Sequence, residues 1–550
     1  MILTEEKKPA PGLYLRQSSG LTREVGLLRS SFFGTNPIGT FPGWGIAFVG
    51  IFAFPIVAGI PLYSWYYFAM LPGFILYAFI TASLSSAIPR TGGAYLYSNR
   101  ILHPYLGWIE SWCMVGFWWS TIAYEAYSVG LGISFISYML DFLYPGNGFA
   151  NWGTFFTTQT GIMVGGIICL AITTLLVFLS SKRFYFAISI LGLSSALIIP
   201  LILLVVPYFS NPATFTANFQ SYTGQAISDV LNKASQNGWM LAMPTLAGAA
   251  SIIFWQFWVP LGFNWNSYIA GELKGNVFKN SFVGSMIALA VLTLSFGFLE
   301  LPYISVFGHS FLNAWSYLYW NGYGPPLGIP PFIPFVAQLA VPSLSWLFII
   351  IGVGILFSMI FTNAVYVWII SRTFFAWSFD RMAPEALSRI NPRTRSPLVA
   401  IAISMVGAFL FLVYSVYVIN LGGLIYFGTL LTMFMWILPG FSALLIARRR
   451  PGMFARMSIN QKVGGVALIT ILGAVWLCYV LPIFGLSLFY PILSSLTNAN
   501  IGALAFLGSS GILFFLMVVI AGTAVYFLIR RWNRRRGIDL DMIFSTIPPD

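Results

Sequence analysis

Charged residues are scarce in this chain. Of its 550 residues, 27 are Lys or Arg and 14 are Asp or Glu, so only 7% are charged, whereas an ordinary soluble domain has about 25%. Apolar residues make up 58%, and the mean hydropathy is +0.84. No soluble fold has enough interior to bury that much apolar surface. The composition therefore excludes a soluble enzyme, a nucleic-acid-binding protein and a disordered chain.

Cysteine and histidine are also rare. The three cysteines, Cys113, Cys169 and Cys478, lie in apolar runs, and their spacing fits neither a zinc site nor a redox pair. We expect them to pack as small apolar side chains. His103 and His309 are far apart, so the sequence predicts no metal site and no cofactor. An intramembrane enzyme would need a buried acid–base or metal constellation such as H-E-x-x-H, and none occurs in the sequence.

Long apolar runs are abundant. They are unbroken for twenty residues or more, unlike the alternating pattern of an outer-membrane barrel. A window of about 20 residues, enough to cross a bilayer as a helix, gives twelve candidate spans. They lie near residues 31–60, 64–88, 105–140, 158–180, 184–208, 241–270, 281–305, 340–372, 397–420, 423–447, 463–489 and 503–529. The sequence thus predicts an all-α polytopic membrane protein.

The basic residues orient these spans. With twelve spans and both termini in the cytoplasm, 26 of the 27 Lys and Arg residues fall on the cytoplasmic side, and only Lys233 does not. This is the bias of the positive-inside rule, and one span more or fewer would destroy it. We therefore expect a multi-pass plasma-membrane protein with cytoplasmic termini, whose +13 net charge reflects anchoring to the bilayer rather than nucleic-acid binding.

Two of the spans are interrupted by proline and glycine. The first contains Pro37, Gly39, Pro42, Gly43 and Gly45, and the sixth contains the run Trp258-Val259-Pro260-Leu261-Gly262. Such breaks free backbone N–H and C=O groups, which in lipid need polar partners. Breaks at matching places in two halves are typical of inverted-repeat transporters that bind substrate at the breaks. A single break would as readily be a simple kink.

Four motifs make the chain similar to a known family. They are Ile38-Gly39-Thr40-Phe41-Pro42-Gly43-Trp44-Gly45-Ile46, Leu84 to Tyr95 (LSSAIPRTGGAY), Trp258 to Gly262 with Gly271-Glu272-Leu273-Lys274, and Ser371 to Pro384 (SRTFFAWSFDRMAP). With these motifs the chain resembles the amino acid–polyamine–organocation (APC) superfamily, the amino acid permeases. The resemblance implies the five-plus-five inverted repeat of the sodium-coupled leucine transporter type (LeuT-like fold) with two extra helices. It also implies transport of amino acids or related amines by alternating access.

This fold divides the chain into six parts. We expect a cytoplasmic segment at 1–30, a first repeat with helices 1–5 at 31–208, an extracellular loop at 209–240, a second repeat with helices 6–10 at 241–447, helices 11 and 12 at 448–530, and a cytoplasmic tail at 531–550. A second long outer loop is expected at about 306–338, which is rich in proline.

The resemblance also implies a substrate site. The substrate carboxylate would take backbone N–H groups of Trp44 and Gly45, and the ammonium would take carbonyls of Phe41, Trp258 and Leu261. Gly43, Gly262 and Asn264 complete the predicted set of substrate-binding residues. Freed N–H groups at a helix N-terminus favour an anion, and freed carbonyls favour a cation, so an amino acid zwitterion suits both.

The chain departs from the family in three places. Trp44 stands where the family usually has serine, and Asn264 stands where many members have glutamate. The fifth span has no lysine within its apolar run, although some proton-coupled relatives use one there as a built-in cation. A polyamine or organic-cation transporter and an amino acid exchanger therefore remain alternatives within the same fold.

Glu125 is the most informative single residue. It lies near the centre of the third span, where an ionisable group costs about 2.5–3.5 kcal/mol on insertion scales. We expect it to carry the coupling proton or to bind a cation; alternatively, it is a neutral carboxyl bonded to nearby backbone. Ser358 and Thr362, one turn apart in the eighth span, are candidates for a sodium site, although such hydroxyls more often bond to their own helix. The predicted partners are thus a small-molecule substrate, a coupling proton or sodium ion, and the lipid bilayer, but no nucleic acid.

Overall fold

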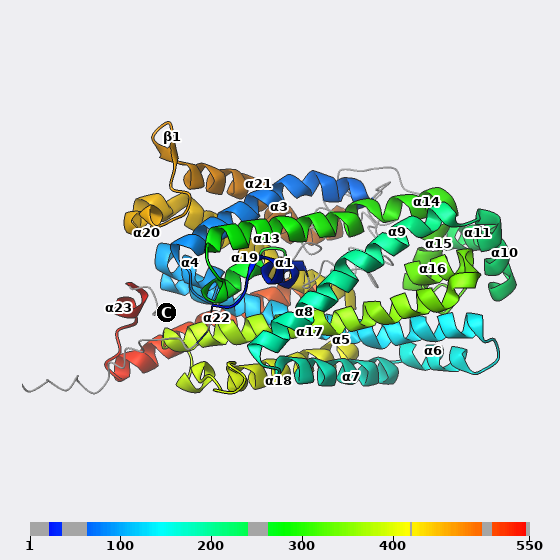
Figure 1. Ribbon diagram of the computed structural model, residues 1–550, viewed down its shortest axis with the longest axis horizontal. Coiled ribbons are helices and arrows are strands. Elements are labelled where there is room, and N and C mark those ends of the chain that lie inside the picture. The colour runs from blue at the N-terminus through cyan, green and yellow to red at the C-terminus, as the bar shows by residue number, and fades with distance from the viewer. Residues whose placement is uncertain are drawn as a thin grey trace, which may run out of the picture.

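The computed structural model describes residues 21, 23–35, 63–239, 262–418, 421–497 and 509–545. In these residues the chain is helical almost throughout. The two strands found there, β1 (Lys462–Val463) and β2 (Val466–Ala467), form an antiparallel hairpin in which Lys462 pairs with Ala467. The long helices run along the longest axis of the molecule, and short elements gather at its two ends (Figure 1). The predicted all-α architecture is confirmed.

The N-terminal half begins with a short helix and continues with long ones. Its elements are α1 (Leu27–Thr35), α3 (Tyr63–Ala87), α4 (Ala94–Tyr97), the π-turn η2 (Ser98–Leu102), α5 (Pro104–Leu143), α6 (Phe149–Thr157), α7 (Gln159–Val177), α8 (Ser181–Leu193), the π-turn η3 (Ser194–Ile198), α9 (Ile199–Phe209), α10 (Pro212–Thr223) and α11 (Ile227–Gln236). Side chains cap several of these helices. His103 accepts a hydrogen bond from the backbone N–H of Tyr105 at the start of α5, and Thr158 accepts one from Gly161 at the start of α7.

The C-terminal half is built in the same way. It contains the 3₁₀ segment η4 (Trp265–Glu272), α13 (Val277–Leu292), the π-turn η5 (Thr293–Phe298), α14 (Glu300–Phe307), α15 (His309–Trp320), α16 (Ile333–Ala340), η6 (Pro342–Leu344), α17 (Ser345–Phe379), η7 (Glu385–Ser388), α18 (Leu398–Tyr417), α19 (Leu421–Arg449), α20 (Pro451–Ala455), α21 (Leu468–Thr497), α22 (Ser509–Arg535) and α23 (Leu540–Ser545).

The candidate membrane spans follow the predicted windows. In the described residues, nine helical stretches are long and apolar enough to cross a membrane, or ten if the bent pair α9–α10 counts as one span. The nine match the second, third, fourth and seventh to twelfth windows, and the fifth window coincides with α8, η3 and α9. The first and sixth windows lie mostly outside the described residues. A polytopic membrane protein is thus confirmed, and the total of twelve spans stays a prediction.

Proline explains the irregular turns of the helices. A proline at position i cannot donate the backbone hydrogen bond to residue i−4, so a regular helix fails just before it. Each of the three π-turns in the described residues contains the position four residues before a proline. η2 precedes Pro104, η3 precedes Pro200 and η5 precedes Pro302. Local π geometry at these places is the response of the backbone to the missing donor.

Two of the longest helices form the centre of the bundle. α5 has 40 residues, about 60 Å of helix, and packs against α17, which has 35 residues. The third window, residues 105–140, is already longer than the about 20 residues of one span, and α5 extends beyond it at both ends. In contrast, the apolar windows of α21 and α22 are only 28% and 17% buried inside the molecule. These two helices therefore present most of their surface to the surroundings.

The two segments expected as long outer loops are partly helical. α10 and α11 occupy residues 212–236, and α15 and α16 lie within 309–340, all at one end of the molecule (Figure 1). They are also joined to each other. The indole of Trp239 donates a 2.9 Å hydrogen bond to Asn313, and the Tyr317 hydroxyl donates a 2.8 Å bond to the Asn237 carbonyl. The sequence did not reveal these helices because the segments are short and rich in proline or polar residues.

Candidate functional site

Most of the predicted substrate-binding residues lie outside the described residues. These are Phe41, Gly43, Trp44, Gly45, Trp258 and Leu261. Gly262 and Asn264, the other two, are described. Gly262 has φ = 102°, a backbone conformation that favours glycine, and Asn264 follows it with a side chain that is 4% exposed. The Asn264 Oδ1 atom has no hydrogen-bond partner among the residues that the structure describes, so none of them satisfies this buried acceptor.

The described flanks of the two interrupted segments are in contact. α1 leads into residues 36–62, and the turn at 262–264 follows residues 240–261. Gly34 of α1 lies so close to this turn that an added Cβ would stand 2.8 Å from the carbonyl oxygen of Phe263. Only a glycine permits this approach of two backbones, so the end of α1 is held against the exit of the sixth span.

A backbone bridge joins the same two regions on the other side of α1. The Val25 N–H donates to the Glu272 carbonyl at 3.0 Å, and the Lys274 N–H donates to the Val25 carbonyl at 2.9 Å. Val25 and Leu273 form an isolated parallel bridge and are both fully buried. The segment before the first span and the segment after the sixth span are therefore fixed as one unit.

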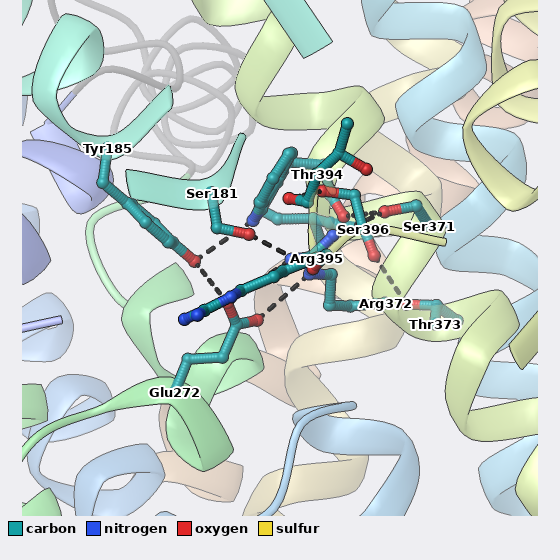
Figure 2. Close-up of polar contacts among 11 residues, drawn as sticks. Ser181, Tyr185, Glu272, Ser371, Arg372, Thr373, Thr394, Arg395 and Ser396 are labelled. Carbon is teal, nitrogen blue, oxygen red and sulfur yellow. Dashed lines mark hydrogen bonds and ion pairs between the residues drawn. The ribbon is translucent and has the colours of Figure 1, made fainter. Parts of the chain in front are cut away.

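A buried ion pair links this unit to the long helix α17. The Arg372 Nε donates to Glu272 Oε1 at 3.0 Å, and its second terminal nitrogen donates to Oε2 at 3.3 Å. Figure 2 shows Tyr185 of α8 reaching the same carboxylate; its hydroxyl donates to Oε2 at 3.0 Å. Arg372 is 1% exposed and Glu272 2% exposed, so both charges are satisfied almost wholly by protein.

Aromatic rings enclose this ion pair. The Arg372 guanidinium lies 3.8 Å from the centroid of the Trp368 ring, a cation–π contact, and the Trp368 indole donates to the Tyr185 hydroxyl at 3.1 Å. Phe184 stacks on the other side of Trp368 with ring centroids 4.0 Å apart. Three elements (η4, α8 and α17) therefore meet at one carboxylate, and Val25 binds the backbone of the same glutamate.

A second buried ion pair closes the same end of the molecule. Arg100 of η2 binds Asp380, at the end of α17, with both terminal nitrogens at 2.6 and 2.5 Å, and it also donates to Asn99. Burial lowers the pKa of Arg100, but Asp380 more than offsets this, so the pKa lies above its ordinary value. The ring of Phe544, in α23, lies 5.3 Å from the guanidinium.

Two glycines let the motif after α3 reach η4. The Gly92 N–H donates to the Tyr268 carbonyl at 3.0 Å, and Gly93 has φ = 55°. A Cβ on Gly93 would overlap the Tyr268 ring. The glycine pair of the predicted motif is therefore required by both backbone conformation and close packing.

Comparison with known families decides the class of this chain. The amino acid permease family matches residues 25–501, most of the chain. The chain belongs to the amino acid permease family. A search of curated proteins finds no match.

Three of the four sequence motifs meet in space within the described residues. The permease family is a family of multi-pass membrane transporters, not of enzymes. In this permease the second motif contacts the third through Gly92 and Gly93, and the third contacts the fourth through Glu272 and Arg372. The motifs are thus the surfaces by which the helices around the two interrupted segments pack together.

Glu125 lies apart from these contacts, in the middle of α5. It is fully buried, and within the described part of the chain neither carboxyl oxygen has a hydrogen-bond partner. Its carboxyl lies near the side chains of Tyr124, Tyr366 of α17 and Cys169 of α7. The expected alternative, a carboxyl bonded to neighbouring backbone, is not what the described residues show.

Uncommitted polar atoms surround Glu125. Asn363 of α17 donates to the Ile122 carbonyl at 3.4 Å and to the Cys169 sulfur at 3.3 Å, which leaves its own Oδ1 without a partner. The Tyr366 hydroxyl is buried and also lacks one. The region between α5, α7 and α17 therefore holds several buried oxygen atoms that no described side chain satisfies.

The two hydroxyl residues predicted for a sodium site also lie on α17. Ser358 is 3% exposed, and its hydroxyl has no hydrogen-bond partner among the described residues. Thr362 is fully buried. The backbone of the first interrupted span, which would complete such a site, lies outside the described residues.

Sequence reasoning missed the two ion pairs. It quoted Glu272, Arg372, Arg100 and Asp380 only as parts of motifs or as cytoplasmic charges, because hydropathy windows place them at the ends of spans. A signal was nonetheless present, since Glu272 and Asp380 are two of only 14 acidic residues in the chain. Where acidic residues are this rare, each one next to an apolar run is a candidate partner for a buried arginine or lysine.

Proposed function

We propose that this permease is a secondary active transporter that moves amino acids across the plasma membrane by alternating access, coupled to protons. Membership of the permease family supports a transporter of this type. The substrate, the coupling ion and the mechanism are the parts that we add from the arrangement of the chain.

The observation that carries the proposal is the contact between the flanks of the two interrupted segments. Gly34 lies against Phe263, and Val25 pairs with Glu272 and Lys274. This contact supports two broken helices side by side, with their freed backbone groups facing one site. A zwitterion satisfies both kinds of freed group: Trp44 and Gly45 would bind its carboxylate, and carbonyls of Phe41, Trp258 and Leu261 its ammonium. The free Oδ1 of Asn264 would add one more acceptor.

The lengths of two helices support an inverted repeat. In a five-plus-five arrangement the third and eighth spans occupy equivalent positions. These are α5 and α17, with 40 and 35 residues, and they pack against each other. We propose that the two repeats comprise residues 31–208 and 241–447, with cytoplasmic termini.

The substrate site is tested with Gly45→Leu. A leucine side chain would fill the turn that binds the carboxylate, so we expect loss of substrate binding with near-normal expression. Counterflow of labelled amino acids in proteoliposomes and the affinity of the purified protein are the measurements. Gly452→Leu is the control, because nothing lies within 4 Å of a Cβ at Gly452. Unchanged affinity in Gly45→Leu would contradict the site.

Selectivity is tested in the same assay. A ligand that lacks its carboxylate or its ammonium leaves freed backbone groups unpaired, at about 1–3 kcal/mol each. We therefore expect a loss of roughly tenfold or more in affinity for either deletion. A diamine that competes better than the amino acid of the same length would replace this proposal by a polyamine transporter.

Coupling is tested at Glu125. A carboxyl that is fully buried and has no partner among the described residues is costly when charged, so it can bind a proton on one side of the membrane and release it where water reaches it. We expect uptake driven by an inward proton gradient, and Glu125→Gln should bind substrate without responding to pH. Asp141→Asn, on the same helix, is the control, because Asp141 is satisfied by Tyr222 at 2.8 Å. Uptake driven by sodium alone, or an unaltered pH profile in Glu125→Gln, would contradict proton coupling through Glu125.

A further inference from the structure

α5 carries a second buried carboxyl, Glu110. Its side chain is fully buried, and both carboxyl oxygens lack a hydrogen-bond partner among the described residues. It lies fifteen residues before Glu125, about 22 Å along the helix, towards the end of the molecule that carries α4, α20 and α23 (Figure 1). The proposed function assigns it no role.

The groups around Glu110 are polar but uncharged. The Ser98 hydroxyl of η2 faces the carboxyl. The hydroxyls of Tyr77 in α3, Tyr97 in α4 and Tyr268 in η4 and the thiol of Cys113 in α5 itself also lie near it. Two of these hydroxyls are committed elsewhere. Tyr97 shares a 2.6 Å hydrogen bond with Ser85, and Tyr268 donates to the Met114 sulfur at 2.8 Å.

The charged groups of neighbouring elements are also committed. Arg100 of η2 and Asp380 at the end of α17 bind each other. In α19, Arg449 and Arg450 donate to the carbonyls of Leu102 and Arg100. Arg530 of α22 pairs with Asp541. No described side chain of opposite charge is therefore paired with Glu110.

This environment requires Glu110 to be protonated in the conformation described here. An ionised carboxyl that is out of water and faces only a neutral hydroxyl, that of Ser98, is strongly disfavoured. The elements that cover Glu110, however, are the ones held by contacts that can separate: α4 and η2 by the Arg100–Asp380 pair, and η4 by the Glu272–Arg372 pair. Movement of these elements away from α5 would admit water to Glu110.

We propose that Glu110 is a second proton-exchanging residue of the transport cycle. When α4, η2 and η4 separate from α5, the Glu110 carboxyl gives its proton to water and becomes a carboxylate; when they close, it takes a proton back from water. This inference rests on the proposed proton coupling. Glu110 would be a second exchange site besides Glu125, nearer the start of α5.

Infrared difference spectroscopy of the purified protein tests the protonation of Glu110 without transport. The protonated-carboxyl stretching band should lose one component in Glu110→Gln, a different component in Glu125→Gln, and both in the double variant. Asp141→Asn, the control on the same helix, should leave the band unchanged. A band unaltered in Glu110→Gln would overturn the inference.

Transport assays test the exchange role. We expect Glu110→Gln to retain substrate counterflow, which needs no proton release, but to lose proton-driven accumulation. Glu110→Asp keeps a carboxyl and should restore part of the proton-driven accumulation. A purely structural role would instead be filled better by glutamine, which keeps the size of the side chain. Wild-type uptake driven by sodium alone would overturn the proposed coupling, and with it the role of Glu110. Proton-driven wild-type uptake with full accumulation in Glu110→Gln would overturn the inference about Glu110 alone.

Discussion

Arg372 is buried, and its charged guanidinium is bound by other side chains. Removing both ions of such a pair from water is expensive, and their attraction repays the cost only when the remaining donors and acceptors are satisfied. Here Tyr185, Ser371 and the Trp368 ring complete the arrangement. The pair therefore specifies how η4, α8 and α17 fit together, even where it adds little net stability.

Substitutions at this pair should be strongly non-additive. Glu272→Gln or Arg372→Met alone leaves one buried ion without its partner, which costs about 3–5 kcal/mol. The double variant Glu272→Met/Arg372→Met removes both ions, and we expect it to be more stable than either single variant. The measurement is the midpoint of thermal unfolding in detergent, followed by tryptophan fluorescence.

The exposed pair Arg530–Asp541 is the matched control. Asp541 is 62% exposed, so loss of this pair should cost about 0–1 kcal/mol. A double-variant effect equal to the sum of the two single-variant effects would show that the two residues act independently.

Single residues differ in how well a sequence predicts them. Depth in an apolar run was sufficient to select Glu125, and the structure shows it fully buried. The partners of Arg100 and Arg372 could not be predicted, because they lie 280 and 100 positions away along the chain. Six of the eight predicted substrate-binding residues lie outside the described residues, so they stay predictions.

Among the elements, long helices were the easiest to predict. Apolar windows located α3, α5 and α18 to within three residues, since a span of about 20 apolar residues has no other stable form in a bilayer. The window of α17 was less accurate, because the helix continues to Phe379, beyond the predicted end at 372. The 3₁₀ segment η4 was not predicted, because it lacks a hydrophobic period and is shaped by its contacts with α1 and α13. Short helices outside the spans, such as α11, escaped for another reason: a search for unbroken apolar runs does not detect a short helix with one polar face.

α23 is a short helix that covers one side of the Arg100–Asp380 ion pair. Its Phe544 covers Arg100 and is 3% exposed, and Asn533, just before it, donates to the Arg381 carbonyl at 2.9 Å. A helix of six residues has little stability of its own. α23 must therefore be held in place by these contacts.

We expect Phe544→Ala to release α23. Loss of one buried aromatic ring costs about 2 kcal/mol, which is a factor of roughly thirty in the opening equilibrium. Hydrogen exchange at residues 538–545 should accelerate accordingly, while the midpoint of global unfolding changes little. Met542→Ala is the control, because Met542 is 66% exposed. Unchanged exchange in Phe544→Ala would mean that other contacts hold this segment.

For the whole molecule, the distribution of charge predicts its orientation in the membrane. The end with α4, α20 and α23 carries the arginines of α19 and α22, and the opposite end carries α10, α11 and α15 (Figure 1). By the positive-inside rule we expect the arginine-rich end to face the cytoplasm. This assignment also places Glu110 on the cytoplasmic half of α5 and Asp141 near its outer end.

Labelling from outside the cell tests this orientation. After replacement of the exposed Cys478 by serine, a cysteine at Asn147, which is exposed between α5 and α6, should react with a membrane-impermeant maleimide in intact cells. A cysteine at Val463, which is 56% exposed in β1, should react only after the cells are permeabilised. The reverse pattern would invert the proposed topology.

The Arg100–Asp380–Phe544 contact has a consequence for how the protein is made. A ribosome produces these three residues in order, so Arg100 enters the nascent chain long before the carboxylate that neutralises it and longer still before the ring that covers it. Until then its guanidinium must stay hydrated at the membrane surface. Closure of this end of the bundle can therefore be completed only after Asp380 and Phe544 have both been synthesised.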